Sequence, residues 1–372
     1  MPLSLRPANP GEAASQIDTP ALILDLDAFE RNLARLMAEV KHSGLRVRPH
    51  AKSHKCPEIA RRQMALGAVG ICCQKVSEAE IFARAGITDI LVTNEVVGAK
   101  KLARLVSLAS QTHLGVLVDA ESALRELGAS ATAKAVSIDV YIEVDVGAAR
   151  CGVAPGLPAV ALAKAMQAYP GLHFKGLHCY HGLAQHLRSP KERTEAIAQA
   201  ARAASNTRQA LSDAGFPVET ITGAGTGSFR LERDSGVFTE LQPGSYIFMD
   251  RDYAINQLAP GEVPFEHALF IETAVMSLAG EHRAVVDAGL KASSIDSGLP
   301  MVWQRDGLQY QKASDEHGVL EVREDIVLAL GEHLRLVPGH CDPTVNLYDW
   351  LVCMRRDTVE ALWPIEARGA LL

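Results

Sequence analysis

The sequence predicts an α/β protein built from a TIM-type (β/α)8 barrel and a smaller, mostly β domain that follows it. From about residue 20, short apolar runs rich in β-branched residues alternate with helix-like stretches, which is typical of parallel βαβ units. After about Pro260 helical patterns become rare, and short strand-like runs are broken by Gly, Asp and Pro. We therefore expect the barrel over residues 18–260 and the β domain over residues 261–372.

Eight apolar runs account for the predicted barrel strands. They are ALILDL from Ala21, RVRPH from Arg46, GICCQK from Gly70, DILVTN from Asp89, LGVLVD from Leu114, SIDVYIEVDVG from Ser137, FKGLHCYHG from Phe174 and TITGAG from Thr220. Eight such units over about 230 residues fit a closed barrel better than an open sheet, which is the alternative.

The first helix follows the first of these runs. Asp27 and Glu30 form a D-x-x-E capping pattern, which marks a helix start. Apolar side chains recur at helical spacing on one face, at Phe29, Leu33, Leu36, Met37 and Val40. This helix should pack against the outside of a sheet. The β domain is represented by the runs AVVDAGLKASS, GLQYQKAS, GVLEV and YDWLVCMRRDTVEALWPI.

Composition excludes several classes of function. The chain has 372 residues, of which 48% are hydrophobic, and 37 Lys and Arg against 44 Asp and Glu give a net charge of −7. The sequence has no Lys/Arg block, so we do not expect nucleic acid as a partner and expect a small molecule instead. No run approaches about 18 apolar residues, and the N-terminus lacks an apolar leader, so neither a membrane span nor export is expected. The seven cysteines contain no C-x-x-C pair and indicate reduced thiols of a cytoplasmic protein.

Polar residues at the ends of the strand runs are the candidate active-site residues, because a barrel carries its site at the carboxyl ends of its strands. The second run leads into Arg48-Pro-His-Ala-Lys52-Ser-His-Lys55. A lysine at this place can form a Schiff base, the chemistry typical of pyridoxal phosphate (PLP) enzymes. An ordinary solvated basic loop is the alternative.

A glycine-rich turn near the eighth run suggests a phosphate site. TGAGTGS starts at Thr222, and QPGSY follows from Gln242. Small residues let backbone N–H groups approach a phosphate, and the hydroxyls of Thr226 and Ser228 add donors. A glycine-rich turn without a ligand is the alternative.

Two further strand ends carry charged or titratable groups. Arg150 lies just beyond the sixth run, where it can pair with an anionic oxygen or be an ordinary surface arginine. The seventh run ends in Tyr180 and His181, and His186 follows, so this strand end can supply a general base. A structural histidine with its hydrogen bonds satisfied is the alternative.

The β domain carries His340-Cys-Asp342-Pro-Thr. In an extended segment residues i and i+2 point the same way, so His340 and Asp342 could reach one ion while Cys341 faces away. Imidazole and carboxylate together suit Mn²⁺, Mg²⁺ or Zn²⁺. The pattern is short, and a purely structural pair is the alternative.

Together these motifs resemble those of the fold-type III PLP enzymes related to alanine racemase, specifically the group of D-threonine aldolase, 3-hydroxy-D-aspartate aldolase and D-serine dehydratase. The resemblance runs from about Thr19 to the C-terminus. It rests on RPHAKSHKCPEIA, GICCQKVSEAE, TNEVVG, EVDVGAARCGV, TGAGTGS, ELQPGSYIFMD, VVDAGLKA, SDEHGV and LRLVPGHCDPT, in that order.

The resemblance implies roles for individual residues. Lys52 would hold PLP covalently, and Arg150 would lie near its phenolic oxygen. The residues implied around its phosphate are Tyr180, Thr226, Gly227, Ser228, Gly244 and Ser245. His340 and Asp342 would bind the metal, and His186 would be nearest the metal-bound substrate hydroxyl. The resemblance also implies that residues 1–17 join the β domain and that two chains form a head-to-tail homodimer.

Two departures from related enzymes refine this expectation. Gln242 stands where racemases place an arginine facing the pyridine nitrogen of PLP, so carbanion stabilisation is expected to be intermediate. His340-x-Asp342 replaces the His-x-Cys pattern of the dehydratase branch. A carboxylate is a harder ligand than a thiolate and suits Mn²⁺ or Mg²⁺, which favours the aldolases.

We therefore expect a PLP- and metal-dependent aldolase that cleaves D-3-hydroxy amino acids of the D-threonine type to glycine and an aldehyde. The alternatives are a 3-hydroxy-D-aspartate aldolase, which would yield glycine and glyoxylate, and a D-serine or 3-hydroxyaspartate dehydratase. A non-catalytic PLP-carrier protein is the alternative from another class, although such a module lacks a second domain.

Overall fold

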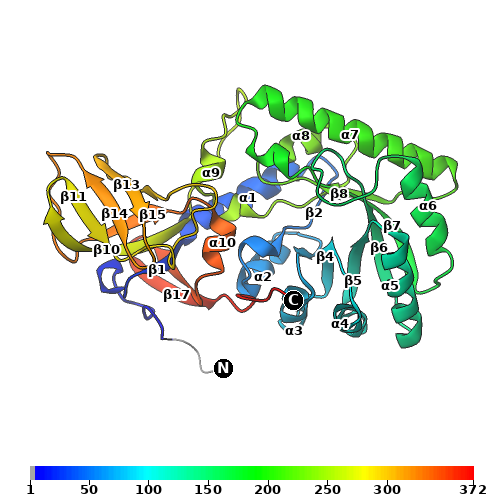
Figure 1. The fold of residues 1–372 in the computed structure, drawn as a ribbon, viewed down its shortest axis with the longest axis horizontal. Helices are drawn as coiled ribbons and strands as arrows, with labels where there is room; N and C mark the ends of the chain where they lie inside the picture. The colour runs from blue at the N-terminus through cyan, green and yellow to red at the C-terminus, as the bar shows by residue number, and fades with distance from the viewer. Residues whose placement is uncertain (1–4) are drawn as a thin grey trace.

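Two β-sheets organise the chain, and the computed structural model describes residues 5–372 of it (Figure 1). The first sheet is the predicted barrel. Its strands are β2 (Arg46–Val47), β3 (Ile71–Cys73), β4 (Asp89–Glu95), β5 (His113–Val118), β6 (Ile138–Glu143), β7 (Leu172–Cys179), β8 (Thr220–Gly223) and β9 (Glu240–Leu241). All pair in parallel in the order β2-β9-β8-β7-β6-β5-β4-β3, and a bridge between His50 and Cys72 links the two ends. The TIM-type barrel is confirmed.

Helices surround this sheet on its outer side (Figure 1). They are α1 (Leu26–Val40), α2 (Pro57–Ala65), α3 (Val76–Arg84), α4 (Ala99–Ala109), α5 (Glu121–Lys134), α6 (Leu157–Met166), α7 (Pro190–Asp213) and α8 (Phe229–Asp234). Short helices η2 (Ala51–Ser53), η3 (Leu183–His186), η4 (Ser245–Ile247) and α9 (Arg251–Ala254) follow the strand ends. Inside the barrel, Cys72, Leu91, Leu117 and Tyr141 from successive strands form one packed layer.

Helix α1 buries the predicted apolar face, including Phe29, Leu33 and Leu36. The predicted capping residue is wrong. Because α1 starts directly after strand β1, the N-cap is Asp25, whose carboxylate accepts from the Ala28 N–H at 3.0 Å. Asp27 lies in the first turn and instead accepts a hydrogen bond from Arg355 at 2.6 Å.

The second sheet has nine strands and forms the predicted β domain. Its strands are β1 (Ala21–Asp25), β10 (Leu269–Gly280), β11 (Arg283–Val286), β12 (Met301–Val302), β13 (Leu308–Ala313), β14 (Gly318–Val322), β15 (His333–Val337), β16 (Trp350–Arg355) and β17 (Thr358–Pro364). Between β15 and β16 lies the short helix α10 (Cys341–Val345). The predicted runs contain β13, β14, β16, β17 and most of β11, whereas β10, β12 and β15 were not predicted.

The assignment of ALILDL to the barrel is wrong, because this run forms β1 in the second sheet. It pairs with β10 in antiparallel and with β16 in parallel orientation. Both faces of this central strand are covered, so residues 21–24 are all buried, the same continuous apolar pattern that a barrel strand shows. The eighth barrel strand is β9, which has only two residues and no pattern of its own.

The segment before β1 lies against the second sheet. Gly11 N donates to Val359 O at 2.8 Å, and Ala13 forms an antiparallel bridge with Thr358. These contacts support the expectation that residues 1–17 join the β domain, although residues 1–4 lie outside the described residues. The domain boundary at residues 260/261 stays a prediction. Among residues 5–372, no helix combines the length and apolar character needed to cross a membrane.

Candidate active site

A cavity of about 150 Å³ lies where the carboxyl ends of the barrel strands face the β domain. Most of the predicted site residues line it together: Lys52, Arg150, Tyr180, His186, Thr226, Gln242, Gly244, Ser245, His340 and Asp342. The exceptions are Gly227 and Ser228, which line a neighbouring cavity of about 690 Å³ on the other side of the same turn. Residues from both domains therefore converge on one site.

Lys52 lies on the short helix η2, which follows β2. Its Nζ is 3.8 Å from Oδ2 of Asp342, across the boundary between barrel and β domain. Burial alone would lower the pKa of Lys52, but Asp342, Tyr180 and Cys341 together outweigh it, so the pKa is raised above its usual value. The neighbouring Lys55 lies outside the cavity and is paired with the buried Glu78 at 2.7 Å. Of the two lysines in this loop, only Lys52 reaches the cavity.

The expectation of an extended segment at His340-Cys341-Asp342 is wrong. His340 has extended backbone angles, but it is the N-cap of α10, and Cys341–Val345 is helical. Pro343 lies in the first turn of α10. An N–H at this position would have no partner within the helix, so proline costs no helical hydrogen bond here. His340 and Asp342 nonetheless line the same cavity, and Cys341 does not.

Hydrogen bonds hold both of these side chains. Nδ1 of His340 lies 2.8 Å from Oδ2 of Asp296, which leaves Nε2 as the nitrogen available to a ligand. The Ser245 hydroxyl donates to Oδ1 of Asp342 at 3.2 Å. A carboxylate behind a ligating imidazole is a common arrangement in metal sites, so the pair fits a divalent metal.

The glycine-rich turn after β8 fits a phosphate. Thr226 is 6% exposed, and its hydroxyl has no hydrogen-bond partner among the described residues. A Cβ at Gly225 would lie 2.5 Å from Oε1 of Gln185, and one at Gly244 would lie 3.0 Å from the carbonyl of His50. A buried unpaired hydroxyl, glycines at which a Cβ would crowd neighbouring atoms, and Lys52 in the same cavity fit PLP.

The Ser228 hydroxyl is turned away from this cavity. It donates to Oε1 of Glu232 at 2.8 Å and accepts from the Gln185 side chain at 2.7 Å. The Gly227 N–H likewise donates to Oε1 of Gln185 at 2.9 Å. The contact of these two residues with the cofactor phosphate stays a prediction.

Glu232 behind this turn should make stability depend on pH. Burial raises its pKa from 4.5 to about 7, so the folded protein binds more protons than the unfolded chain in that interval. The free energy of unfolding therefore falls as pH rises through this range. Glu232→Gln should unfold like the wild type near about pH 5 and be about 1–3 kcal/mol more stable near about pH 8. Urea unfolding at both pH values measures this, and an equal difference at both would contradict it.

Gln242 belongs to a buried chain of hydrogen bonds. Its Nε2 donates to the Thr222 hydroxyl at 2.8 Å. This hydroxyl in turn donates to Oε1 of Glu240 at 3.1 Å. Oε1 of Gln242 lies 3.2 Å from Nε2 of His178. Glu240 in turn pairs with Arg48 at 3.0 Å. The amide is thereby held in one place at the cavity wall.

Arg150 projects over the ring of Tyr180, with 5.5 Å from its guanidinium carbon to the ring centroid. Its Nη2 is 3.5 Å from Oε1 of Glu143. Burial raises the pKa of Glu143, but the adjacent His178 and Arg150 lower it. The net result is a pKa below the usual value. Burial and the adjacent Glu143 raise the pKa of Glu95. These directions favour a protonated Glu95 and an ionised Glu143, and the Glu143 carboxylate pairs with Arg150.

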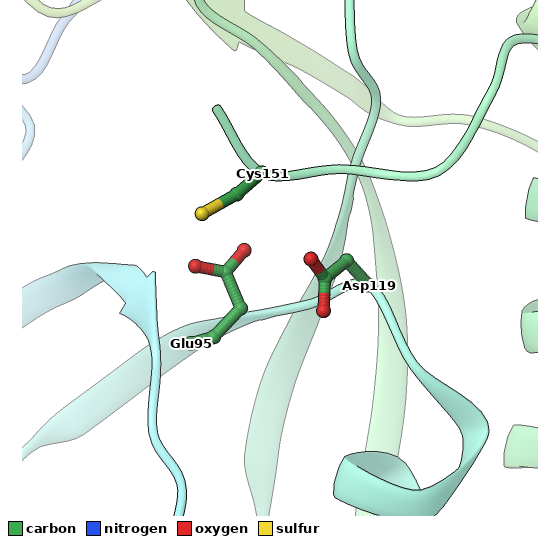
Figure 2. A group of neighbouring side chains, drawn as sticks. All are labelled: Glu95, Asp119 and Cys151. Atoms are coloured by element: carbon green, nitrogen blue, oxygen red, sulfur yellow. The ribbon is translucent and has the colours of Figure 1, made fainter. Parts of the chain in front are cut away.

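Glu95 also belongs to a second group of possible metal ligands, with Asp119 and Cys151 (Figure 2). Their ligand atoms lie within 4.8 Å of one another. Burial raises the pKa of the Cys151 thiol to about 11, and that of Glu95 is raised as well. Protonated ligands bind metal poorly, so this group is a weaker candidate than His340 and Asp342.

Several cavity residues were not predicted as site residues: His50, Gln74, Thr93, His178, Ala224, Gly225 and Tyr253. Most follow barrel strands, so the strand-end rule contained a signal for them. Tyr253 on α9 had none. His50 is buried, and this burial together with the charge of Lys52 holds its pKa well below the usual value. Its imidazole is therefore neutral beside the lysine.

Comparison with known proteins agrees with this geometry. The model of the alanine racemase N-terminal domain matches residues 24–252, and that of a serine dehydratase domain matches residues 268–354. The first match covers more than half of the chain. It corresponds to the barrel, and the second lies in the β domain with His340 and Asp342.

Three relatives match over almost the whole chain. A D-threonine aldolase from Arthrobacter sp is 48% identical, over 98% of this chain and 96% of that protein. A 3-hydroxy-D-aspartate aldolase from Paracoccus denitrificans (strain Pd 1222) is also 48% identical, over 98% and 95%. The crystal structure of D-threonine aldolase from Filomicrobium marinum has 50% sequence identity and a TM-score of 0.97, covering 98% of this chain and 100% of that one. The chain therefore belongs to the family of D-threonine and 3-hydroxy-D-aspartate aldolases, PLP-dependent carbon–carbon lyases with an alanine racemase-like barrel.

Proposed function

We propose that this protein cleaves D-3-hydroxy amino acids of the D-threonine type into glycine and an aldehyde, using PLP and a divalent metal. One observation carries the proposal. The imidazole of His340 and the carboxylate of Asp342 enter the same cavity as Lys52, with 3.8 Å between Lys52 and Asp342. A metal held there can contact the hydroxyl of a substrate bound at the lysine.

The residues that would hold PLP follow from the cavity lining. Lys52 would bind it covalently, Arg150 would face its phenolic oxygen, and Gln242 its pyridine nitrogen. Around the phosphate we place Tyr180, Thr226, Gly227, Ser228, Gly244 and Ser245. When bound, PLP withdraws electrons from whichever bond at the substrate Cα lies perpendicular to its ring.

His340 and Asp342 would hold the metal, and their nitrogen and oxygen ligands support Mn²⁺ or Mg²⁺. A bound divalent ion lowers the pKa of a coordinated hydroxyl. His186, which lines the same cavity, would take the hydroxyl proton, directly or through a water. Loss of that proton would allow the Cα–Cβ bond to break, because the oxygen becomes the carbonyl oxygen of the aldehyde. The electron pair of the broken bond would stay with Cα, which takes up a proton to give glycine.

Cleavage of 3-hydroxy-D-aspartate is the second candidate, supported by the equally similar Paracoccus relative. The two substrates differ at Cβ, where one carries a methyl group and the other a carboxylate. The dehydratase alternative is less well supported because Asp342 stands where that branch has cysteine. A non-catalytic carrier is not supported, since relatives that match the whole chain are enzymes.

We further propose that the enzyme is a cytoplasmic homodimer. The seven cysteines are all free thiols, and six of them are buried, which suits a reducing compartment.

A product assay tests the proposed reaction. The PLP enzyme with Mn²⁺ is incubated separately with D-threonine, 3-hydroxy-D-aspartate, D-serine and L-threonine, and glycine is measured against keto acid. We expect glycine from D-threonine and no turnover of the L-isomer. Keto acid and ammonia as the main products, without glycine, would instead place the enzyme among the dehydratases.

A further inference from the structure

Asp252 lies directly behind His186. Oδ2 of Asp252, on α9, is 2.6 Å from Nδ1 of His186, at the end of η3. The Asp252 side chain is 7% exposed, whereas 46% of the His186 side chain is exposed. An ionised carboxylate only accepts hydrogen bonds, so Nδ1 must carry the proton. In the neutral ring, Nε2 then holds the lone pair that can accept a proton.

Arg188 keeps Asp252 in this orientation. Its Nη2 donates to Oδ1 of Asp252, and its Nη1 donates to the Asp252 carbonyl at 2.6 Å and to Oδ1 of Asn256 at 2.7 Å. Each carboxylate oxygen thus has its own fixed donor. Arginine cannot accept a hydrogen bond, so Oδ1 of Asp252 faces a donor whichever tautomer His186 adopts.

Helix α9 also contacts the segment that leads into His340. Arg251 N donates to Pro338 O at 3.0 Å, and Asp252 N donates to Gly339 O at 3.2 Å. Asp250, the N-cap of α9, accepts from the Cys341 N–H at 2.8 Å. The same helix therefore holds the histidine after β7 and the segment carrying His340 and Asp342 in a fixed relation.

We propose that Asp252 is a positioning residue of the reaction, which fixes the tautomer of His186 and holds its Nε2 toward the cavity beside His340 and Asp342. This inference rests on the proposed function, in which His186 removes the hydroxyl proton. A side chain outside the cavity then determines whether the base can act, because the other tautomer presents an N–H where a lone pair is needed.

Asp252→Asn is the informative variant. The asparagine must turn its carbonyl oxygen to Arg188, since two donors would otherwise meet, so its NH₂ group faces Nδ1 of His186. The ring is thereby forced into the tautomer that is protonated on Nε2. We expect kcat for D-threonine cleavage to fall by about 10²–10⁴-fold, as when the orienting carboxylate of a catalytic histidine becomes an amide, with KM changed little.

Two further variants complete the test. Asn256→Ala removes a neighbour of Arg188 but leaves the His186–Asp252 hydrogen bond, and kcat should stay within about threefold of the wild type. His186→Asn removes the base and identifies its NMR signal. ¹⁵N-histidine spectra of the PLP enzyme with diamagnetic Mg²⁺ should show His186 protonated on Nδ1 in the wild type and on Nε2 in Asp252→Asn.

The outcomes separate the two claims. If His186→Asn loses activity while Asp252→Asn keeps wild-type kcat and the Nδ1 proton, the positioning role is overturned and the proposed function stands. If Asp252→Asn and Asn256→Ala lose activity equally and the tautomer is unchanged, Asp252 is merely structural. If His186→Asn is fully active, the assignment of the base in the proposed function is itself wrong.

Discussion

Replacing Lys52 with alanine is expected to remove covalent PLP and to reduce cleavage by roughly three orders of magnitude or more, as for loss of other covalent catalytic groups. Lys52 is the lysine of the loop after β2 that reaches the cavity, and alanine offers no amine for covalent attachment. The loss of the yellow absorbance of lysine-bound PLP reports attachment, and product formation reports activity.

Lys55 provides the matched control in the same loop. It is buried against Glu78 and donates to the carbonyl of Ala367 at 3.4 Å, so Lys55→Met should lower stability while leaving PLP attached. Borohydride reduction followed by peptide mapping locates the attached cofactor. A label on Lys55 rather than Lys52 would show that the assignment is wrong.

Removal of either proposed metal ligand should abolish metal binding and slow cleavage by at least about 10²-fold, since a Lewis-acid ion supplies several kcal/mol of stabilisation to the reacting oxygen. His340→Ala and Asp342→Ala should nevertheless retain PLP, because both residues come from the β domain and Lys52 does not. Metal content by mass spectrometry and absorbance of the bound cofactor measure the two properties separately. Chelation of the wild type should have the same effect, and Mn²⁺ should reverse it.

Two cysteines serve as controls for the metal site. Cys341 lies between the proposed ligands but outside the cavity, and Cys151 belongs to the second group beside Glu95 and Asp119. The variants Cys341→Ala and Cys151→Ala should both retain the metal ion bound by His340 and Asp342. Loss of metal in Cys151→Ala, with His340→Ala unaffected, would move the metal to the second group.

The barrel could be predicted because its strands repeat one pattern, but the pattern does not say which sheet a strand enters. β1 and the barrel strand β4 are each covered on both faces over most of their length, so both contain a continuous apolar run. Only the pairing of Ala21–Asp25 with β10 and β16 distinguishes them, and such pairing joins residues far apart in the chain. β9 was not predicted, because a strand of two residues shows no periodicity.

The candidate site was predictable wherever a strand end supplied the residue. Lys52, Arg150 and Tyr180 each follow a barrel strand closely, and the sequence marks where those strands end. The conformation at His340 was not predictable in this way, because a five-residue helix is too short to show a period. The contact between Asp252 and His186 joins residues 66 positions apart, so no single sequence motif contains both residues.

The most direct measurement of the central claim follows the hydrogen on the substrate Cα. D-threonine carrying deuterium at Cα is turned over by the Mn²⁺ enzyme, and the earliest products are analysed by mass spectrometry. Retro-aldol cleavage breaks the Cα–Cβ bond and leaves the Cα hydrogen in place, so we predict glycine that retains the deuterium, together with acetaldehyde. Deuterium released to water, with ammonia and 2-oxobutanoate as the products, would contradict the account.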